Sequence, residues 1–161
     1  MRYLYLCLIL LTCVIARASD MPVLPEKSGQ VTLSVQDDPA KPARELTVYI
    51  RYPKGARASI SEQTGLMLIL HNWGGRGFSG APYSDALAAD YNMVLIGVDY
   101  FQSGDDPKDP TPYDFGYLQA MDALRGLYCV YAGLDHLKIP FDHRRIYGGG
   151  GSGGGNVIQM A

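Results

Sequence analysis

The fold of this chain is decided by residues 141–161, which read FDHRRIYGGGGSGGGNVIQMA. Within this stretch RRIY indicates a short strand, and NVIQMA can start a helix. Between them, residues 150–154 read GGSGG and satisfy the pattern G-x-S-x-G around Ser152. A serine on a tight turn from a strand to a helix is the arrangement of a nucleophile elbow. The stretch therefore predicts a sheet that presents Ser152 at the end of a strand.

The same glycines also fit a flexible linker, because GGGGS is a common linker composition. Position favours the elbow. Gly150 and Gly154 stand two residues before and after Ser152, where side chains would collide as strand and helix close in. The helix that follows would direct its free N–H groups at negative charge beside the serine. A linker would join two domains, whereas only six residues follow Gly155.

A second motif follows a continuous apolar run. Residues 66–70, LMLIL, indicate a strand buried on both faces, and residues 71–75, HNWGG, follow it directly. In an elbow architecture, a loop at this place supplies one backbone N–H to an oxyanion hole. We expect that N–H from Trp73, or alternatively from Asn72. The residue after the nucleophile, Gly153, is expected to supply the second.

Three residues of this loop are expected to support the donor. Gly74 and Gly75 let the backbone approach a substrate closely. His71 is expected to brace the loop rather than to act as a catalyst. In enzymes that carry their serine on a nucleophile elbow, the catalytic histidine follows the serine in the sequence. His71 instead precedes Ser152.

The order of elements predicts the fold class. Two segments with alternating polarity come first, and then strands and helices alternate, which is typical of an open α/β sheet with right-handed crossovers. We expect the first strands to be antiparallel, the later ones parallel with flanking helices, and the sheet to be truncated after the elbow. The segments are strands at 30–36, 45–53, 66–70, 93–100 and 144–150, and helices at 82–92, 115–134 and from 156.

These motifs together resemble the N-terminal part of α/β-hydrolase catalytic domains, over about residues 45–161. The resemblance is strongest to prolyl-oligopeptidase-like enzymes and related secreted serine esterases. LMLILHNWGG, ALAADYNMVLIGVDY and the D-x-x-R-I lead-in formed by Asp142, Arg145 and Ile146 carry it. It implies a serine hydrolase in which Ser152 attacks an ester or peptide carbonyl and forms an acyl-enzyme, with no cofactor.

The triad of that family runs Ser, then Asp or Glu, then His. All three histidines, His71, His136 and His143, precede Ser152, and no acidic residue follows it. We therefore expect an incomplete domain that is inactive by itself and forms an enzyme only in its full-length form. Two alternatives stay open: a non-catalytic secreted binding module with a glycine-rich tail, and a pseudoenzyme.

The N-terminus predicts export. Arg2, the apolar residues 3–15 and Ala16-Arg17-Ala18 have the form of a signal peptide, and the apolar run is too short for a typical membrane span. An uncleaved anchor is the alternative. We expect a signal peptide at 1–18, an arm and first strand at 19–43, and the hydrolase part at 44–161. The protein would be secreted or periplasmic, with no stable membrane insertion after cleavage.

Composition limits the partners. Net charge is −2, which gives no reason to expect nucleic acid, and apolar and charged contents of 47% and 19% suit a globular domain. A small-molecule ester or peptide is the expected substrate. His136 and His143 have no cysteine beside them, and the acidic loop at 105–110 lacks EF-hand spacing, so no metal site is expected. Cys129 lies in an apolar run and is expected to be a buried thiol.

Overall fold

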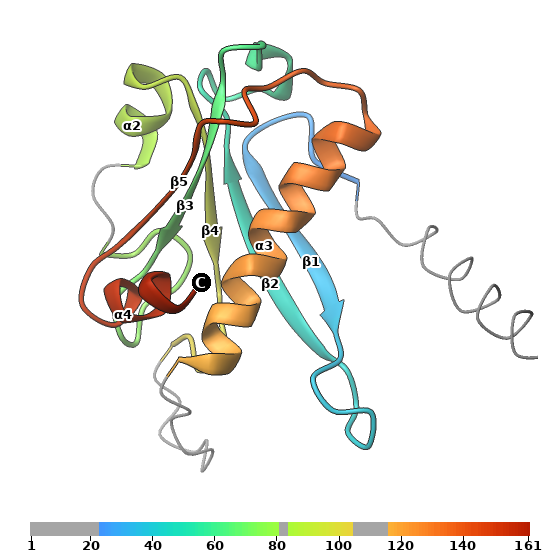
Figure 1. Ribbon diagram of the computed structural model, residues 1–161, viewed down its shortest axis with the longest axis vertical. Helices are drawn as coiled ribbons and strands as arrows, with labels where there is room; N and C mark the ends of the chain where they lie inside the picture. The colour runs from blue at the N-terminus through green and yellow to red at the C-terminus, as the bar shows by residue number, and fades with distance from the viewer. Residues whose placement is uncertain (1–22, 81–83, 105–115) are drawn as a thin grey trace, which may run out of the picture.

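The computed structural model describes residues 23–80, 84–104 and 116–161 (Figure 1). The predicted signal peptide and the acidic loop at 105–110 lie outside these residues. None of the helices in the described part is long and apolar enough to cross a membrane. The elements are β1 (Gly29–Val35), β2 (Arg44–Arg51), the 3-10 helix η1 (Arg57–Ser59), β3 (Gly65–Leu70), α2 (Ser84–Asp90), β4 (Met93–Val98), α3 (Tyr117–His136), β5 (Ile146–Gly150) and α4 (Gly153–Met160).

The five strands form one sheet in the order β1-β2-β4-β3-β5. β1 pairs with β2 and β2 with β4 in antiparallel fashion, whereas β3 is parallel to both β4 and β5. This confirms the predicted open α/β sheet, antiparallel first and parallel afterwards. Leu70 pairs with Gly150, so β3 and β5 end at the same edge of the sheet. The loops that follow these two strands, with HNWGG and Ser152, therefore emerge side by side.

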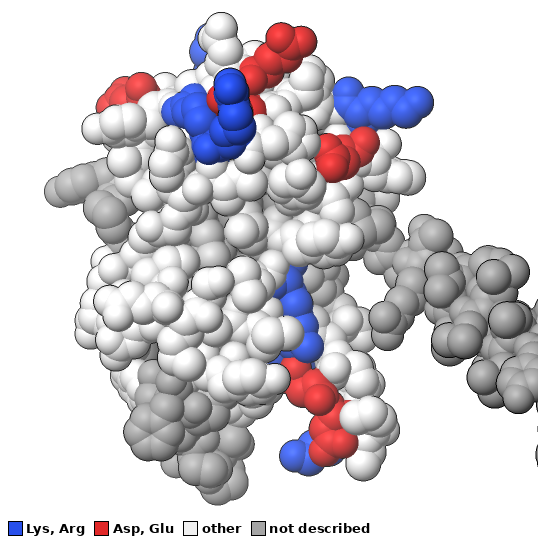
Figure 2. Space-filling model, viewed as in Figure 1, with Lys and Arg blue, Asp and Glu red and all other residues white. Residues whose placement is uncertain are grey.

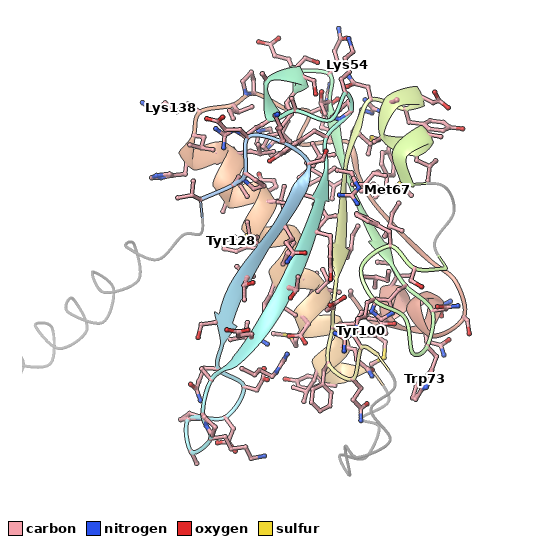
Figure 3. All side chains as sticks on the ribbon, turned by 180° about the vertical axis from the view of Figure 1, so that it is seen from behind. Lys54, Met67, Trp73, Tyr100, Tyr128 and Lys138 are labelled. Carbon is pink, nitrogen blue, oxygen red and sulfur yellow. The ribbon has the colours of Figure 1, made fainter. Side chains whose placement is uncertain are left out.

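Side chains of the central strands alternate between two apolar layers. Leu66, Leu68 and Leu70 of β3 belong to the larger layer, and Ile69 belongs to a smaller one on the other face. Seen from opposite sides, α3 and α4 cover one face of the sheet and α2 covers the other (Figures 1 and 3). Burial of a leucine or isoleucine side chain contributes about 1.5–3 kcal/mol. The two layers thus fix the sheet as the rigid support of its edge loops.

Small residues let α3 lie close to the sheet. A Cβ atom on Gly126 would lie 3.5 Å from a methyl group of Val48 and closer still to Val98. Cys129, on the same helix, is buried, as the sequence predicted. Burial raises the pKa of its thiol to about 11. The thiol is therefore a core group and not a nucleophile.

The D-x-x-R-I segment anchors the start of β5. The backbone N–H of Asp142 donates to the carbonyl oxygen of Thr64 at 2.8 Å. The guanidinium of Arg145 donates to the carbonyl oxygen of Tyr91 at 2.9 Å, and it also binds the carbonyl oxygen of Gln63. These bonds tie the segment to the loops before β3 and β4. They fix where β5 begins, and hence where it ends.

Several strands and helices begin or end one or two residues from the predicted positions, and two segments differ more. The last helix begins at Gly153 rather than at Asn156, because the chain turns at Ser152 and the N–H of Asn156 already donates to the carbonyl oxygen of Ser152 at 3.2 Å. The polar connection after β2 contains η1, in which the N–H groups of Ser59 and Ile60 donate to carbonyl oxygens three residues back.

Candidate active site

Ser152 lies on the turn between β5 and α4. Its backbone has φ 51° and ψ −119°, a conformation that residues other than glycine rarely adopt. Such backbone strain costs about 1–3 kcal/mol and persists only where the surroundings impose it. The side chain is exposed. The strand, turn and helix expected around Ser152 are therefore present, and the turn presents its hydroxyl to solvent.

Two glycines allow this turn. A Cβ atom on Gly150 would lie 2.5 Å from the carbonyl of Gly154, and one on Gly154 would lie 2.6 Å from the carbonyl oxygen of Leu70. Backbone atoms cannot rotate away as a flexible side chain can. Gly151 differs, because a Cβ there would have nothing within 4 Å. The close approach therefore requires glycine at the two outer positions of GGSGG but not before the serine.

The loop after β3 brings a second backbone N–H to the elbow. The amide nitrogen of Trp73 lies 3.1 Å from the position of a Cβ atom on Gly153. Trp73 and Gly153, with Gly74, also line one small hollow. The indole is 56% exposed, and Figure 3 shows Trp73 at the same end of the sheet as Tyr100. The two residues whose N–H groups are expected to bind an oxyanion thus lie beside each other, and Gly153 is the first residue of α4.

The alternative donor, Asn72, makes two contacts within its own loop. Its carbonyl oxygen accepts a hydrogen bond from the N–H of Gly75 at 3.0 Å, and its carboxamide packs against Gly80, where a Cβ would lie 2.7 Å away. These contacts close the turn that carries Trp73. In this loop the amide nitrogen of Trp73 is the one found beside Gly153, and Gly75 keeps the turn closed.

His71 is fully buried and has partners at both ring nitrogens. Nδ1 lies 2.7 Å from the carbonyl oxygen of Asn72, and Nε2 lies 2.6 Å from the hydroxyl oxygen of Ser103. A carbonyl can only accept, so Nδ1 carries the proton and Ser103 donates to Nε2. The ring stacks on Tyr100 at 4.1 Å, and burial lowers the pKa of His71. These contacts are those of a histidine that braces its loop.

The loop after β4 is tied to the same place. The hydroxyl of Tyr100 donates to the carbonyl oxygen of His71 at 2.8 Å. Asp99 accepts from the hydroxyl of Tyr49 at 3.0 Å and from the N–H of Gly77 at 2.7 Å. Asp99 and Tyr100 thereby connect the end of β4 to the loop that carries Trp73. Neither residue was singled out from the sequence, because each bond depends on the parallel pairing of β3 with β4.

A buried carboxylate holds the loop after β4 from behind. Asp122 of α3 is fully buried and accepts from Arg44 at 2.7 Å, from Arg125 at 3.0 Å and from the N–H of Phe101 at 2.9 Å. Hydrogen bonds to Asp122 and Asp37 raise the pKa of Arg44, although burial opposes them. Helix α3 and the β1–β2 hairpin are thus linked to the loop beside the site. The sequence signal for this network was the acidic residue Asp122 at a position where the apolar pattern of the helix predicts a residue facing the core.

A general base for Ser152 is not found among the three histidines. The ring of His71 is saturated as described above, and Nδ1 of His143 is hydrogen-bonded to the hydroxyl of Tyr131 at 2.8 Å. His136 is exposed in the last turn of α3. In the part of the chain that the structure describes, no hydrogen bond joins the Ser152 side chain to a histidine, and no group of three His, Cys, Asp or Glu residues could hold a metal.

Solved enzymes have the same arrangement of strands and helices. The rice cell wall degrading esterase LipA of Xanthomonas oryzae matches with a TM-score of 0.54 and 17% identity, over 81% of this chain and 36% of its own. Pyrococcus horikoshii acylaminoacyl peptidase matches with a TM-score of 0.52 and 17% identity, over 85% of this chain and 20% of its own. The chain thus spans about a third and a fifth of their lengths. No protein-family model and no curated protein sequence matches the chain.

Proposed function

We propose that this chain, which has the α/β-hydrolase fold, belongs to a serine hydrolase that cleaves an ester or peptide bond through an acyl-enzyme. The observation that carries the proposal is the pairing of two backbones: Ser152 at φ 51° and ψ −119°, and the amide nitrogen of Trp73 beside Gly153. A strained serine beside two backbone N–H groups that could bind an oxyanion is what acyl transfer needs. The packing of the sheet and helices alone does not require a strained serine at this position.

The chemistry follows from these positions. The hydroxyl oxygen of Ser152 attacks the substrate carbonyl carbon, and the carbonyl oxygen becomes an oxyanion. The N–H groups of Trp73 and Gly153 donate to that oxyanion, and the N-terminus of α4 adds its dipole. The serine proton passes to a general base and then to the leaving group, as the carbonyl re-forms and leaves an acyl group on Ser152. Water then releases the acyl group by the same steps.

The 161 residues do not supply the general base that would accept the proton of Ser152. Because His71 is enclosed and His136 and His143 belong to the far end of α3 and its loop, none is placed to take the Ser152 proton. We infer that the 161 residues turn over substrate slowly or not at all by themselves, and that activity belongs to the full-length enzyme. A pseudoenzyme built on the same fold is the remaining alternative.

The proposed substrate class is argued from the surface of the chain, and the proposed location from its N-terminus. β5 and α4 carry no charged residue, and Figure 2 shows that the middle of the face covered by α3 and α4 is largely uncharged. A neutral small-molecule ester or peptide suits such a surface better than nucleic acid does. The esterase and peptidase among the similar structures fit the same range of substrates. Residues 1–18 would direct secretion or periplasmic export, with no stable membrane insertion after cleavage.

A non-catalytic secreted binding module with a glycine-rich tail is the second candidate. It requires that residues 148–155 be a flexible extension. The parallel pairing of β5 with β3, from Ile146 to Gly150, speaks for the hydrolase instead.

Reaction with p-nitrophenyl acetate tests the proposal. In the full-length form we expect mass spectrometry to find an acetyl group on Ser152, absent in Ser152→Ala, whereas the 161 residues alone should release p-nitrophenol at close to the uncatalysed rate. Acetylation of the full-length form that is unchanged in Ser152→Ala would contradict the hydrolase proposal. Sustained turnover by the 161 residues that Ser152→Ala abolishes would instead contradict only the inference that these residues lack a base.

A further inference from the structure

A buried carboxamide lies beside the candidate oxyanion site. Gln119, in the first turn of α3, is 2% exposed. Its Nε2 donates a long hydrogen bond of 3.4 Å to Oε1 of Gln102. Its own Oε1 is buried and has no hydrogen-bond partner in the described structure. An acceptor left in this state costs about 1–3 kcal/mol, so it calls for a donor that the protein itself does not supply.

The position of Gln119 gives that acceptor a use. Its side chain lines the same hollow as Trp73 and Gly153, together with Tyr100, Gln102 and Val157. The cavity volume is about 10 Å³. That is roughly the space that a single water-sized atom occupies. The hollow is therefore lined both by Gln119 and by the two residues whose N–H groups are proposed to bind the oxyanion, and it has room for about one oxygen atom.

We propose that Gln119 is a specificity-determining residue that accepts a hydrogen bond from a hydroxyl group on the carbon next to the scissile carbonyl. This rests on the proposed function, in which Trp73 and Gly153 bind the carbonyl oxygen. A 2-hydroxyacyl group supplies both hydrogen-bonding groups. Its carbonyl oxygen accepts from the N–H groups of Trp73 and Gly153, and its hydroxyl donates to Oε1 of Gln119. A hydroxyl group fits the hollow, which has room for about one oxygen atom. An acylamino group does not fit, because the acyl group attached to its nitrogen needs more space.

Binding of two matched esters tests the proposal without requiring turnover. Methyl lactate and methyl propionate differ by one hydroxyl group. Each is titrated into the ¹⁵N-labelled chain, and dissociation constants are read from the amide shifts of Gly153 and Trp73. We expect methyl lactate, as one of its enantiomers, to bind at least about tenfold more tightly than methyl propionate. Gln119→Met, which removes the acceptor at similar size, should bring the two constants within about twofold.

Two further variants keep the test independent of folding defects. Gln119→Asn withdraws the carboxamide by one methylene and should also lose the preference. Gln30→Met makes the same chemical change at an exposed position of β1 and should keep it. Equal affinities in the unaltered chain, or a preference that survives both Gln119 variants, would overturn the role of Gln119 alone. If neither ester shifts Gly153 or Trp73, the oxyanion site fails, and the proposed function fails with it.

Discussion

The backbone of Gly154 packs directly against the carbonyl oxygens of Leu70 and His71, so that a Cβ atom on Gly154 would lie 2.6 Å from the oxygen of Leu70. This contact joins the first turn of α4 to the end of β3. It sets the distance between the two N–H groups of Trp73 and Gly153. The elbow and the loop after β3 therefore form one unit, and a change at the contact should disturb both.

Gly154→Ala should lower the free energy of unfolding by about 2 kcal/mol, because the backbone atoms in contact cannot move aside. The measurement is a urea unfolding curve. Gly151→Ala is the matched control, since a Cβ there has nothing within 4 Å, and it should change stability by less than about 0.5 kcal/mol. Equal effects of the two substitutions would mean that the contact with Leu70 and His71 is absent.

Asp122→Ala should cost about 3 kcal/mol, because it leaves Arg44, Arg125 and the N–H of Phe101 without their shared buried acceptor. It should also shift the amide resonances of the loop after β4. Asp135→Ala is the control.

The Asp135 carboxylate is exposed and lies 3.9 Å from His143, so its removal should cost less than about 0.5 kcal/mol. Urea unfolding compares the two variants. A loss of under 1 kcal/mol for Asp122→Ala would contradict the linking role given to this carboxylate.

Burial lowers the pKa of His71 below its ordinary value of 6.5. In the unfolded chain His71 therefore becomes protonated near pH 6.5, whereas in the folded chain it stays neutral until the pH is lower. Stability is complete above pH 6.5 and is lost as the pH falls below it, by up to about 1.4 kcal/mol per pH unit. The lowered carboxyl pKa values of Asp37 and Asp142 act in a separate range, because their ordinary value is 3.8.

Unfolding curves between pH 7.5 and 5.5 check this dependence. His71→Gln should flatten it, whatever its effect on stability at pH 7.5. His136→Gln, at an exposed position, should leave the slope unchanged. An equal slope in the His71 variant would show that another group titrates.

The sheet could be predicted because its signals are local. Alternating and continuous apolar runs marked the first four strands, the short segment RRIY marked the fifth, and the glycines around Ser152 marked the turn into α4. The start of α4 could not be placed, because GGG has no helical preference of its own and becomes helical only where Gly154 packs on Leu70 and His71.

The surroundings of the site were harder to predict, because they depend on contacts between distant segments. Ser103 and Tyr100 meet His71 only through the pairing of β3 with β4, and Asp122 meets Phe101 only through the packing of α3. Gln119 looks in the sequence like an ordinary polar position of a helix. Its burial beside Trp73 and Gly153 is visible only in the folded chain.

Labelling of the full-length form with a fluorophosphonate tests the central claim, that Ser152 is the nucleophile, most directly. The chain offers its own control in Ser103, a serine that is hydrogen-bonded to His71 at 2.6 Å but does not stand on the turn between β5 and α4. Peptide mapping should place a single adduct on Ser152, retained in Ser103→Ala and lost in Ser152→Ala. An adduct on Ser103, or labelling that persists undiminished in Ser152→Ala, would contradict the claim.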